Sequence, residues 1–191
     1  DVEKVAERLQ AAARPIIVAG GGARVSGAGA EITALAEKLQ IPILNSTGAM
    51  ALTPENHPLY CGVPGTYSRS CSNKAMLASD LVLFIGSEVG GQLTHFWKLP
   101  KPGTEIIQIG IDANDLGRNY PNSVSVLGDA KVTVEALVGA VNKREAGSWV
   151  AEVQKMVADW RAGIEPYRNS DATPMRPERV LNELSDCLPE D

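Results

Sequence analysis

Residues 14–22 read RPIIVAGGG, a short run of mostly β-branched apolar side chains that a proline introduces and three glycines end. Such a run predicts a strand that is buried on both faces, as the strands of a parallel sheet are. Residues 80–86, DLVLFIG, repeat the pattern and give the clearest strand of the chain. Shorter runs of the same kind predict further strands over residues 41–45, 105–111 and 123–127.

Helical spacing fills most of the segments between these strands. Apolar residues recur every three or four positions over residues 2–13, 28–40, 131–141 and 149–164, and another helix is expected over residues 68–78. Alternation of strands and helices is typical of a parallel sheet covered by helices. The sequence therefore predicts an α/β, Rossmann-like fold, with a parallel sheet of about five to six strands and helices on both faces.

Composition narrows the classes of protein. With 191 residues, 44% of them hydrophobic and 21% charged, the chain suits one globular domain. It holds no apolar run of about 20 residues, so no membrane role is expected. The net charge is −5 and the basic residues form no run, so nucleic acid is not an expected partner. Three cysteines without CxxC spacing favour neither a disulfide framework nor a zinc site, and we expect a cytoplasmic protein.

The two ends of the sequence have their own patterns. The chain starts at Asp1, without an initiator methionine, directly in a helical pattern. After the turn-rich residues 168–177, a last helical pattern over residues 180–188 has an apolar face with no obvious surface to cover, and the chain stops at Asp191. We therefore divide the chain into residues 1–165 as the domain and 166–191 as a linker and helix, and we expect it to be a piece of a longer protein.

Small residues follow nearly every predicted strand, where ligands of open parallel sheets bind. These exits read GGGA at 20–23, NSTG at 45–48, GSEVGGQ at 86–92, Ile111-Asp112, and Gly128-Asp129-Ala130. Glycine at such points lets a phosphate-bearing ligand approach the backbone, although tight turns need glycine for structural reasons too. A nucleotide-type ligand and a purely structural use of the glycines are both open at this stage.

Two common nucleotide motifs are missing. A GxGxxG dinucleotide fingerprint starting at Gly20 fails because Val25 stands at its last glycine, and a P-loop fails because Ala28 follows Gly27 in place of lysine. Asn45 occupies the place of the usual ribose-binding carboxylate. If a nucleotide binds, Asp112 or Asp129 is the better candidate to hold its ribose or adenine.

No residue stands out as catalytic, and no metal ligand set is evident. His57 in a proline-rich turn reads as a capping or solvated histidine, and His95 beside two aromatic residues reads as a packing or interface residue. Cys61 and Cys71 read as buried, inert thiols. Ser46, Thr47 and Ser87 lack the G-x-S-x-G elbow that presents a nucleophile. Glu88 is the most interesting single residue as a functional candidate. The structural alternative is that it is a charged loop side chain in contact with water.

The order of four segments resembles the central domain of thiamine diphosphate (thiamine pyrophosphate)-dependent enzymes of the acetolactate synthase, pyruvate oxidase and benzaldehyde lyase group. These segments are RPIIVAGGGA, NSTGAMALTPENHPLYCGVPG, ASDLVLFIGSEVGG and IIQIGIDANDLGRNYPNSVSVLGDA, and the likeness runs from about Val2 to Val141. The resemblance implies a parent of three domains, a homodimer or homotetramer acting as a carboligase or decarboxylase on 2-oxo acids. The absent first and third domains would be the partners of this one, and residues 174–191 resemble the approach to the third.

The resemblance also implies where the cofactors lie. In that family the first domain supplies a glutamate that activates thiamine diphosphate, and the third supplies a GDG...N motif for Mg²⁺ and the diphosphate. This sequence has no GDG, and its one GD pair is Gly128-Asp129, so no residue here is assigned to that cofactor or to Mg²⁺.

The family's central domain is of the deoxyhypusine synthase-like NAD/FAD-binding type, and it holds FAD, ADP or nothing in different members. Carried over by position, the nucleotide-facing residues are Gly20, Gly21, Gly22, Ala23, Thr47, Gly48, Gly62, Val63, Gly65, Gly86, Ser87, Glu88, Ile111, Asp112, Gly128, Asp129 and Ala130.

One departure from the family pattern concerns charge. Members that bind flavin or ADP commonly carry an arginine in the loop after the third strand, whereas this chain has Glu88 there. An acid repels a pyrophosphate, which argues against FAD, while Arg24 or Arg118 could supply the missing positive charge. Two interpretations of this central domain therefore remain open, a structural role and nucleotide binding. Two other kinds of protein also remain possible: a stand-alone FAD/NAD(P)-binding or electron-transfer module, and an interaction domain with an empty pocket.

Overall fold

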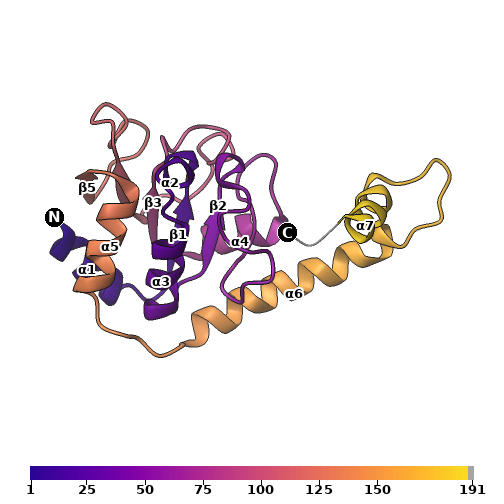
Figure 1. Cartoon of the computed structure of the whole chain (residues 1–191), viewed down its shortest axis with the longest axis horizontal. Coiled ribbons are helices and arrows are strands. Elements are labelled where there is room, and N and C mark those ends of the chain that lie inside the picture. Colours follow the sequence, from indigo (N-terminus) through magenta and orange to yellow (C-terminus); the bar gives the residue numbers. More distant parts are fainter. Residues whose placement is uncertain (189–191) are drawn as a thin grey trace.

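The structure, a computed structural model, describes residues 1–188 and consists of a sheet domain and a helical arm (Figure 1). The sheet has five parallel strands in the order β2-β1-β3-β4-β5. This confirms the predicted Rossmann-like sheet with helices on both faces. The strands are β1 (Pro15–Ala19), β2 (Ile43–Asn45), β3 (Leu81–Ile85), β4 (Glu105–Gly110) and β5 (Val124–Leu127). The helices are α1 (Val2–Ala11), α2 (Gly21–Val25), α3 (Gly29–Leu39), α4 (Ser70–Ala78), α5 (Ala130–Ala140), α6 (Ser148–Arg168) and α7 (Pro177–Cys187), with a 3-10 turn, η1 (Thr47–Ala49).

Alternate residues of each central strand enter two separate cores. Ile17 and Ala19 of β1 face α1, α3 and α5, whereas Ile16 and Val18 face α4 and the first half of α6. Every residue of β1 and β3 is buried. This two-sided burial is the physical reason why these strands have continuous apolar sequences.

A rudimentary sixth strand extends the sheet beyond β2. Tyr60 forms a parallel bridge with Ile43, Cys61 donates its backbone N–H to the carbonyl of Ile43 at 2.9 Å, and Asn45 donates to the carbonyl of Gly62 at 3.1 Å. The sequence predicted only an irregular connection here, because this segment carries three prolines and no alternating pattern. The extra pairing agrees with the predicted five to six strands.

Helix α2 is an element that the sequence did not predict. It starts at Gly21, inside the glycine triplet, although glycine disfavours helices by about 1 kcal/mol per residue. Its first turn is held by the neighbouring strand exit, because the N–H of Gly22 donates to the carbonyl of Gly86 at 2.9 Å. Tertiary packing therefore overrides local propensity at this point.

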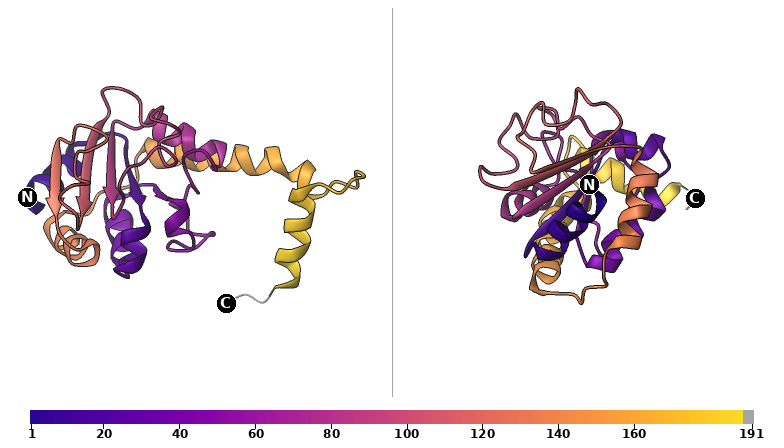
Figure 2. Two further views of the ribbon diagram at one scale, coloured as in Figure 1. Left: turned by 90° about the horizontal axis from the view of Figure 1, so that it is seen from above. Right: turned by 90° about the vertical axis from the view of Figure 1, so that its left-hand side faces the viewer.

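Helices α6 and α7 form the arm. The start of α6 is fixed to the sheet by Trp149, whose indole N–H donates to the carbonyl of Pro15 at 2.8 Å. The helix then passes the predicted end at Ile164 and continues through Pro166 in its last turn. Because proline has no N–H, the helix lacks one backbone hydrogen bond there. Figure 2 shows α7 at the far end of α6, apart from the sheet domain. The expected boundary between residues 165 and 166 falls inside α6 and stays a prediction.

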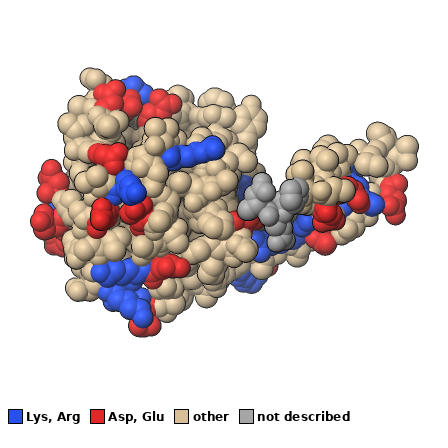
Figure 3. All heavy atoms as spheres, viewed as in Figure 1, with Lys and Arg blue, Asp and Glu red and all other residues tan. Residues whose placement is uncertain are grey.

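The surface carries both signs of charge. On the face drawn in Figure 3, basic and acidic side chains are interspersed over the sheet domain and along the arm. Among residues 1–188, no helix has the length and apolar character that a bilayer crossing requires.

Candidate functional site at the carboxyl ends of the strands

The exits of β1 and β3 pack directly against each other. Gly20 donates its N–H to the carbonyl of Ile85 at 2.8 Å, and Gly22 donates to the carbonyl of Gly86 at 2.9 Å. A Cβ added at Gly20 would lie well under 3.0 Å from backbone atoms of Gly86, and one at Gly86 equally close to the backbone around Ala23. These glycines allow two strand exits to touch, which is a packing role.

A cavity of about 380 Å³ lies beside this junction. It sits where the strand order reverses, between β1 and β3, which is the expected ligand position of a doubly wound sheet. Of the predicted site residues it brings together Gly21, Gly22, Thr47, Gly48, Gly86, Ser87 and Glu88. Ser46, Gly90, Gly91 and Gln92, which belong to the predicted strand exits but were not assigned to the site, also line it. Pro64, Tyr67 and Leu93, which the sequence did not single out, complete the wall.

The predicted residues of the next loop shape the backbone near this cavity without lining it. Gly62 and Gly65 have φ angles of 97° and 103°, in the region that favours glycine. Asn73 holds Gly65 from both sides, accepting its N–H at 2.8 Å and donating to its carbonyl at 3.0 Å. Val63 is half-buried, and its neighbour Pro64 faces the cavity.

The remaining predicted residues lie after β4 and β5, outside the cavity. Ile111 and Asp112 are exposed, and an oxygen of Asp112 accepts the backbone N–H of Asn114 at 2.8 Å. Asp129 caps α5 by accepting the N–H of Val132 at 3.1 Å. Gly128 precedes this cap and Ala130, which is buried, begins the helix. The two carboxylates proposed for a ribose are therefore both engaged in local turns.

Charge in the cavity wall is acidic. Glu88 is the only carboxylate among the lining residues, and none of them is a lysine or an arginine. The phenol of Tyr67 is the one other titratable group in the lining. Arg118 lies 3.5 Å from Glu88 and 2.8 Å from Asp115, so its charge is shared between two carboxylates. Arg24 is exposed and does not line the cavity. A ligand here would meet hydroxyls, amides and backbone groups with one carboxylate, and no cation that pairs with a pyrophosphate.

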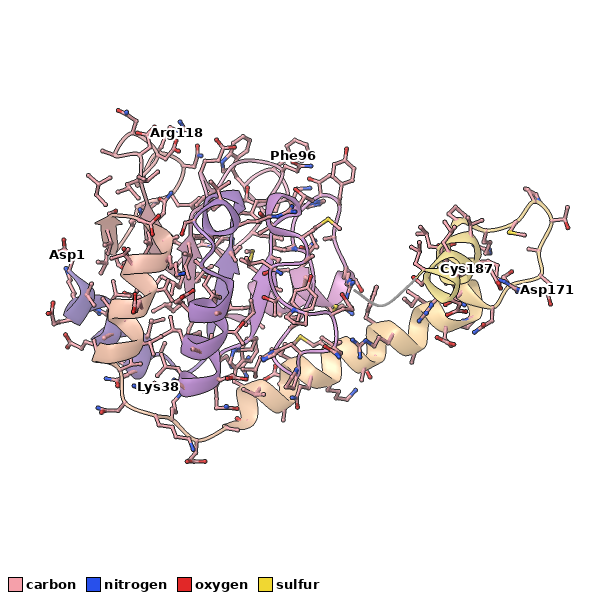
Figure 4. All side chains as sticks on the ribbon, in the orientation of Figure 1. Asp1, Lys38, Phe96, Arg118, Asp171 and Cys187 are labelled. Atoms are coloured by element: carbon pink, nitrogen blue, oxygen red, sulfur yellow. The ribbon has the colours of Figure 1, made fainter. Side chains whose placement is uncertain are left out.

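A left-handed turn borders the cavity. His95, Phe96 and Trp97 have φ angles between 48° and 60°, a strained conformation for residues other than glycine. The ring of Trp97 lies over Gly91, which lines the cavity, and both Phe96 and Trp97 are more than half exposed. Phe96 and Arg118 lie at the same end of the sheet, and Cys187 lies far from them on the arm (Figure 4).

Gln108 organises the loops around this end of the sheet. It is buried in the middle of β4 and donates to the carbonyls of Ser87 and Asp115 at 2.9 and 3.2 Å. Its own side-chain oxygen accepts from the N–H of Gly117 and from the amide of Asn122. Gln108 was not among the residues predicted from the sequence, although a polar side chain inside an apolar strand was a usable signal.

The two histidines and the cysteines Cys61 and Cys71 make local packing contacts and hydrogen bonds. His57 accepts the backbone N–H of Leu59 at 3.2 Å on Nδ1, so it caps a turn as expected. His95 lies beside Phe96, with ring centres 6.5 Å apart, and is half-buried. Cys61 and Cys71 are buried as predicted, and they also contact each other, which the sequence did not show.

The doubly wound sheet with its edge cavity defines a domain of the Rossmann-like class. The family model described as "Thiamine pyrophosphate enzyme, central domain" matches residues 2–137. The chain belongs to this family, which confirms the resemblance drawn from its sequence.

Curated relatives match almost the whole chain. A protein of Pseudomonas aeruginosa named "Probable 2-ketoarginine decarboxylase" is 33% identical, over 97% of this chain and 32% of its own length. Pyruvate oxidase of Lactiplantibacillus plantarum is 29% identical, over 96% of this chain and 30% of the relative. Glyoxylate carboligase of Escherichia coli is 28% identical, over 100% of this chain and 33% of the relative. The chain thus spans about a third of the length of these relatives.

Proposed function

We propose that this chain is the central, supporting domain of a thiamine pyrophosphate-requiring carboligase or decarboxylase that acts on 2-oxo acids. The observation that carries the proposal is the central-domain match over residues 2–137, together with relatives named as a carboligase, a decarboxylase and an oxidase. Nothing in these comparisons supports the alternative of a stand-alone FAD- or NAD(P)-binding module.

The residues of this chain do not fit the cofactor that the family implies. Among residues 1–188, no group of three or more histidine, cysteine, aspartate or glutamate side chains could hold a metal ion. The edge cavity has no basic side chain to pair with a diphosphate. We therefore assign thiamine pyrophosphate and Mg²⁺ to other parts of a longer parent. The test is a titration with thiamine pyrophosphate of the full-length protein and of this chain separately, because the proposal predicts opposite results for the two.

The arm supplies the surface through which we expect the other domains of the parent to pack. Helix α7 has no buried residue, and its apolar side chains Val180, Leu181 and Leu184, with Leu188 directly after the helix, are between 41% and 66% exposed. An amphipathic helix with its apolar face in water gains stability when a neighbour covers it. This geometry agrees with the proposed neighbouring domains and with a homodimeric or homotetrameric parent. Three free thiols fit a cytoplasmic location.

The edge cavity provides a separate test of FAD and ADP. Because Glu88 lines the cavity and no lysine or arginine does, we expect about 1 mM FAD or ADP to leave the melting temperature of this chain unchanged. Adenosine is the control, since it carries the ring without the phosphates. A rise of several degrees with ADP and none with adenosine would show that the domain holds a pyrophosphate, contrary to the supporting role.

A further inference from the structure

Two cysteines meet at the ends of the loop that carries Pro64 and Tyr67 of the cavity wall. Cys61 lies in the segment that pairs with β2, and Cys71 is the second residue of α4. The Sγ of Cys71 lies 3.5 Å from the carbonyl oxygen of Cys61, and the hydroxyl of Ser72 donates to the same carbonyl at 2.6 Å. Both cysteines belong to the same buried core, and each is only 1% exposed.

The two thiols differ in acidity. A hydrogen bond from the thiol of Cys61 lowers the pKa of Cys71 to about 7, against the opposing effect of burial, with Ser72 and the positive charge of Arg69 acting in the same direction. The same hydrogen bond and burial raise the pKa of Cys61. The other charged or titratable groups nearby are Tyr60 and Glu55, and Glu55 is paired with Arg69. Cys71 is thus the thiol that ionises near neutral pH, and the thiolate is the reactive form.

We propose that Cys61 and Cys71 form a dithiol site that hydroperoxides convert into an intramolecular disulfide, with Cys71 as the attacking residue. The thiolate of Cys71 attacks one oxygen of hydrogen peroxide, the O–O bond breaks, and hydroxide leaves and is protonated to water. The resulting sulfenic acid is attacked by the sulfur of Cys61, whose proton leaves with the hydroxyl group as a second water. Two thiols are oxidised and one peroxide is reduced to two waters.

This bond would act on the wall of the edge cavity. Cys61 and Cys71 are ten residues apart, and the loop between them carries Pro64 and Tyr67, which line the cavity. A disulfide closes this loop covalently and restricts its motion. The proposal concerns the described domain alone and does not depend on the activity of a parent enzyme.

Burial sets the conditions of the experiment. Cys187 is exposed on α7 and would react first and between molecules, so the test uses Cys187→Ser as the background. Hydrogen peroxide is chosen because it is about the size of water and can enter a buried site during small local openings. After oxidation the protein is unfolded in an alkylating reagent, and free thiols, intact mass and linked peptides are measured.

We expect the free thiols of Cys187→Ser to fall from two to none, the mass to fall by about 2 Da, and a peptide linking Cys61 to Cys71 to appear and to vanish on reduction. The additional change Cys61→Ser should trap the sulfenic acid on Cys71, detected as a dimedone adduct, and Cys71→Ser should leave Cys61 unmodified. Two free thiols after prolonged oxidation of folded Cys187→Ser, or linkage between molecules only, would overturn the proposal. Peptide mapping of the wild-type chain gives the same answer if a variant fails to fold.

Discussion

Replacing Gly20 by alanine is expected to cost this domain about 3 kcal/mol of folding free energy or more. Gly20 has φ and ψ of −101° and 178°, which any residue adopts, so the cost is purely steric. The added Cβ would overlap the backbone of Gly86 and the Cβ of Ser87, and neither neighbour is the movable end of a flexible side chain. The residues that follow β1 and β3 would have to move apart, which displaces the backbone beside the edge cavity.

Gly21→Ala is the matched control, one residue away in the same triplet. Its new Cβ would lie no closer than 3.8 Å to any neighbour, and alanine favours helix α2 more than glycine does. We expect a melting temperature close to that of the wild type or slightly higher for Gly21→Ala, and one lower by roughly 10 °C for Gly20→Ala. Equal melting temperatures for the two variants in thermal unfolding would contradict the packing role of Gly20.

Gln108→Leu is expected to have an effect of similar size for a different reason. Leucine keeps most of the volume but leaves the carbonyls of Ser87 and Asp115, the N–H of Gly117 and the amide of Asn122 without this partner. Buried groups that lose their partner cost about 1–3 kcal/mol each, and some will find water, so we expect a loss of about 3 kcal/mol. Hydrogen exchange should also become faster in residues 86–89 and 112–122.

Ser125→Ala is the control for Gln108→Leu. Ser125 is the neighbour of Gln108 across β4 and β5, its side chain accepts one hydrogen bond from Asn122, and it is exposed. Water replaces that bond, so unfolding should change by less than about 0.5 kcal/mol. A Gln108→Leu protein as stable as Ser125→Ala, with unchanged hydrogen exchange, would show that Gln108 does not organise these loops.

The sheet could be predicted from the sequence because burial on both faces leaves a direct trace in it. The runs at residues 15–19 and 81–85 are apolar throughout because their strands lie between two layers of helices. Helix α2 and the pairing of Tyr60 with Ile43 left no such trace. Both depend on contacts with residues distant in the sequence, which a local pattern does not contain.

The position of the candidate site could be predicted from the sequence, but only some of its lining residues could. The strand exits after β1, β2 and β3 do meet at one cavity, as the topology of a parallel sheet requires. The exits after β4 and β5 do not reach it, and Asp129 serves as a helix cap, which looks the same in sequence as a ligand-binding carboxylate. Tyr67 lies on a loop whose path depends on tertiary contacts, so its position in the sequence does not place it at the cavity.

Titration calorimetry with thiamine pyrophosphate and Mg²⁺ tests the central claim most directly. The claim has two parts, that a full-length parent requires this cofactor and that residues 1–191 do not hold it. We predict that the full-length protein containing this sequence binds about one thiamine pyrophosphate per chain and that the isolated chain gives no binding heat under the same conditions. Binding by the isolated chain, or no binding by the full-length protein, would contradict the account.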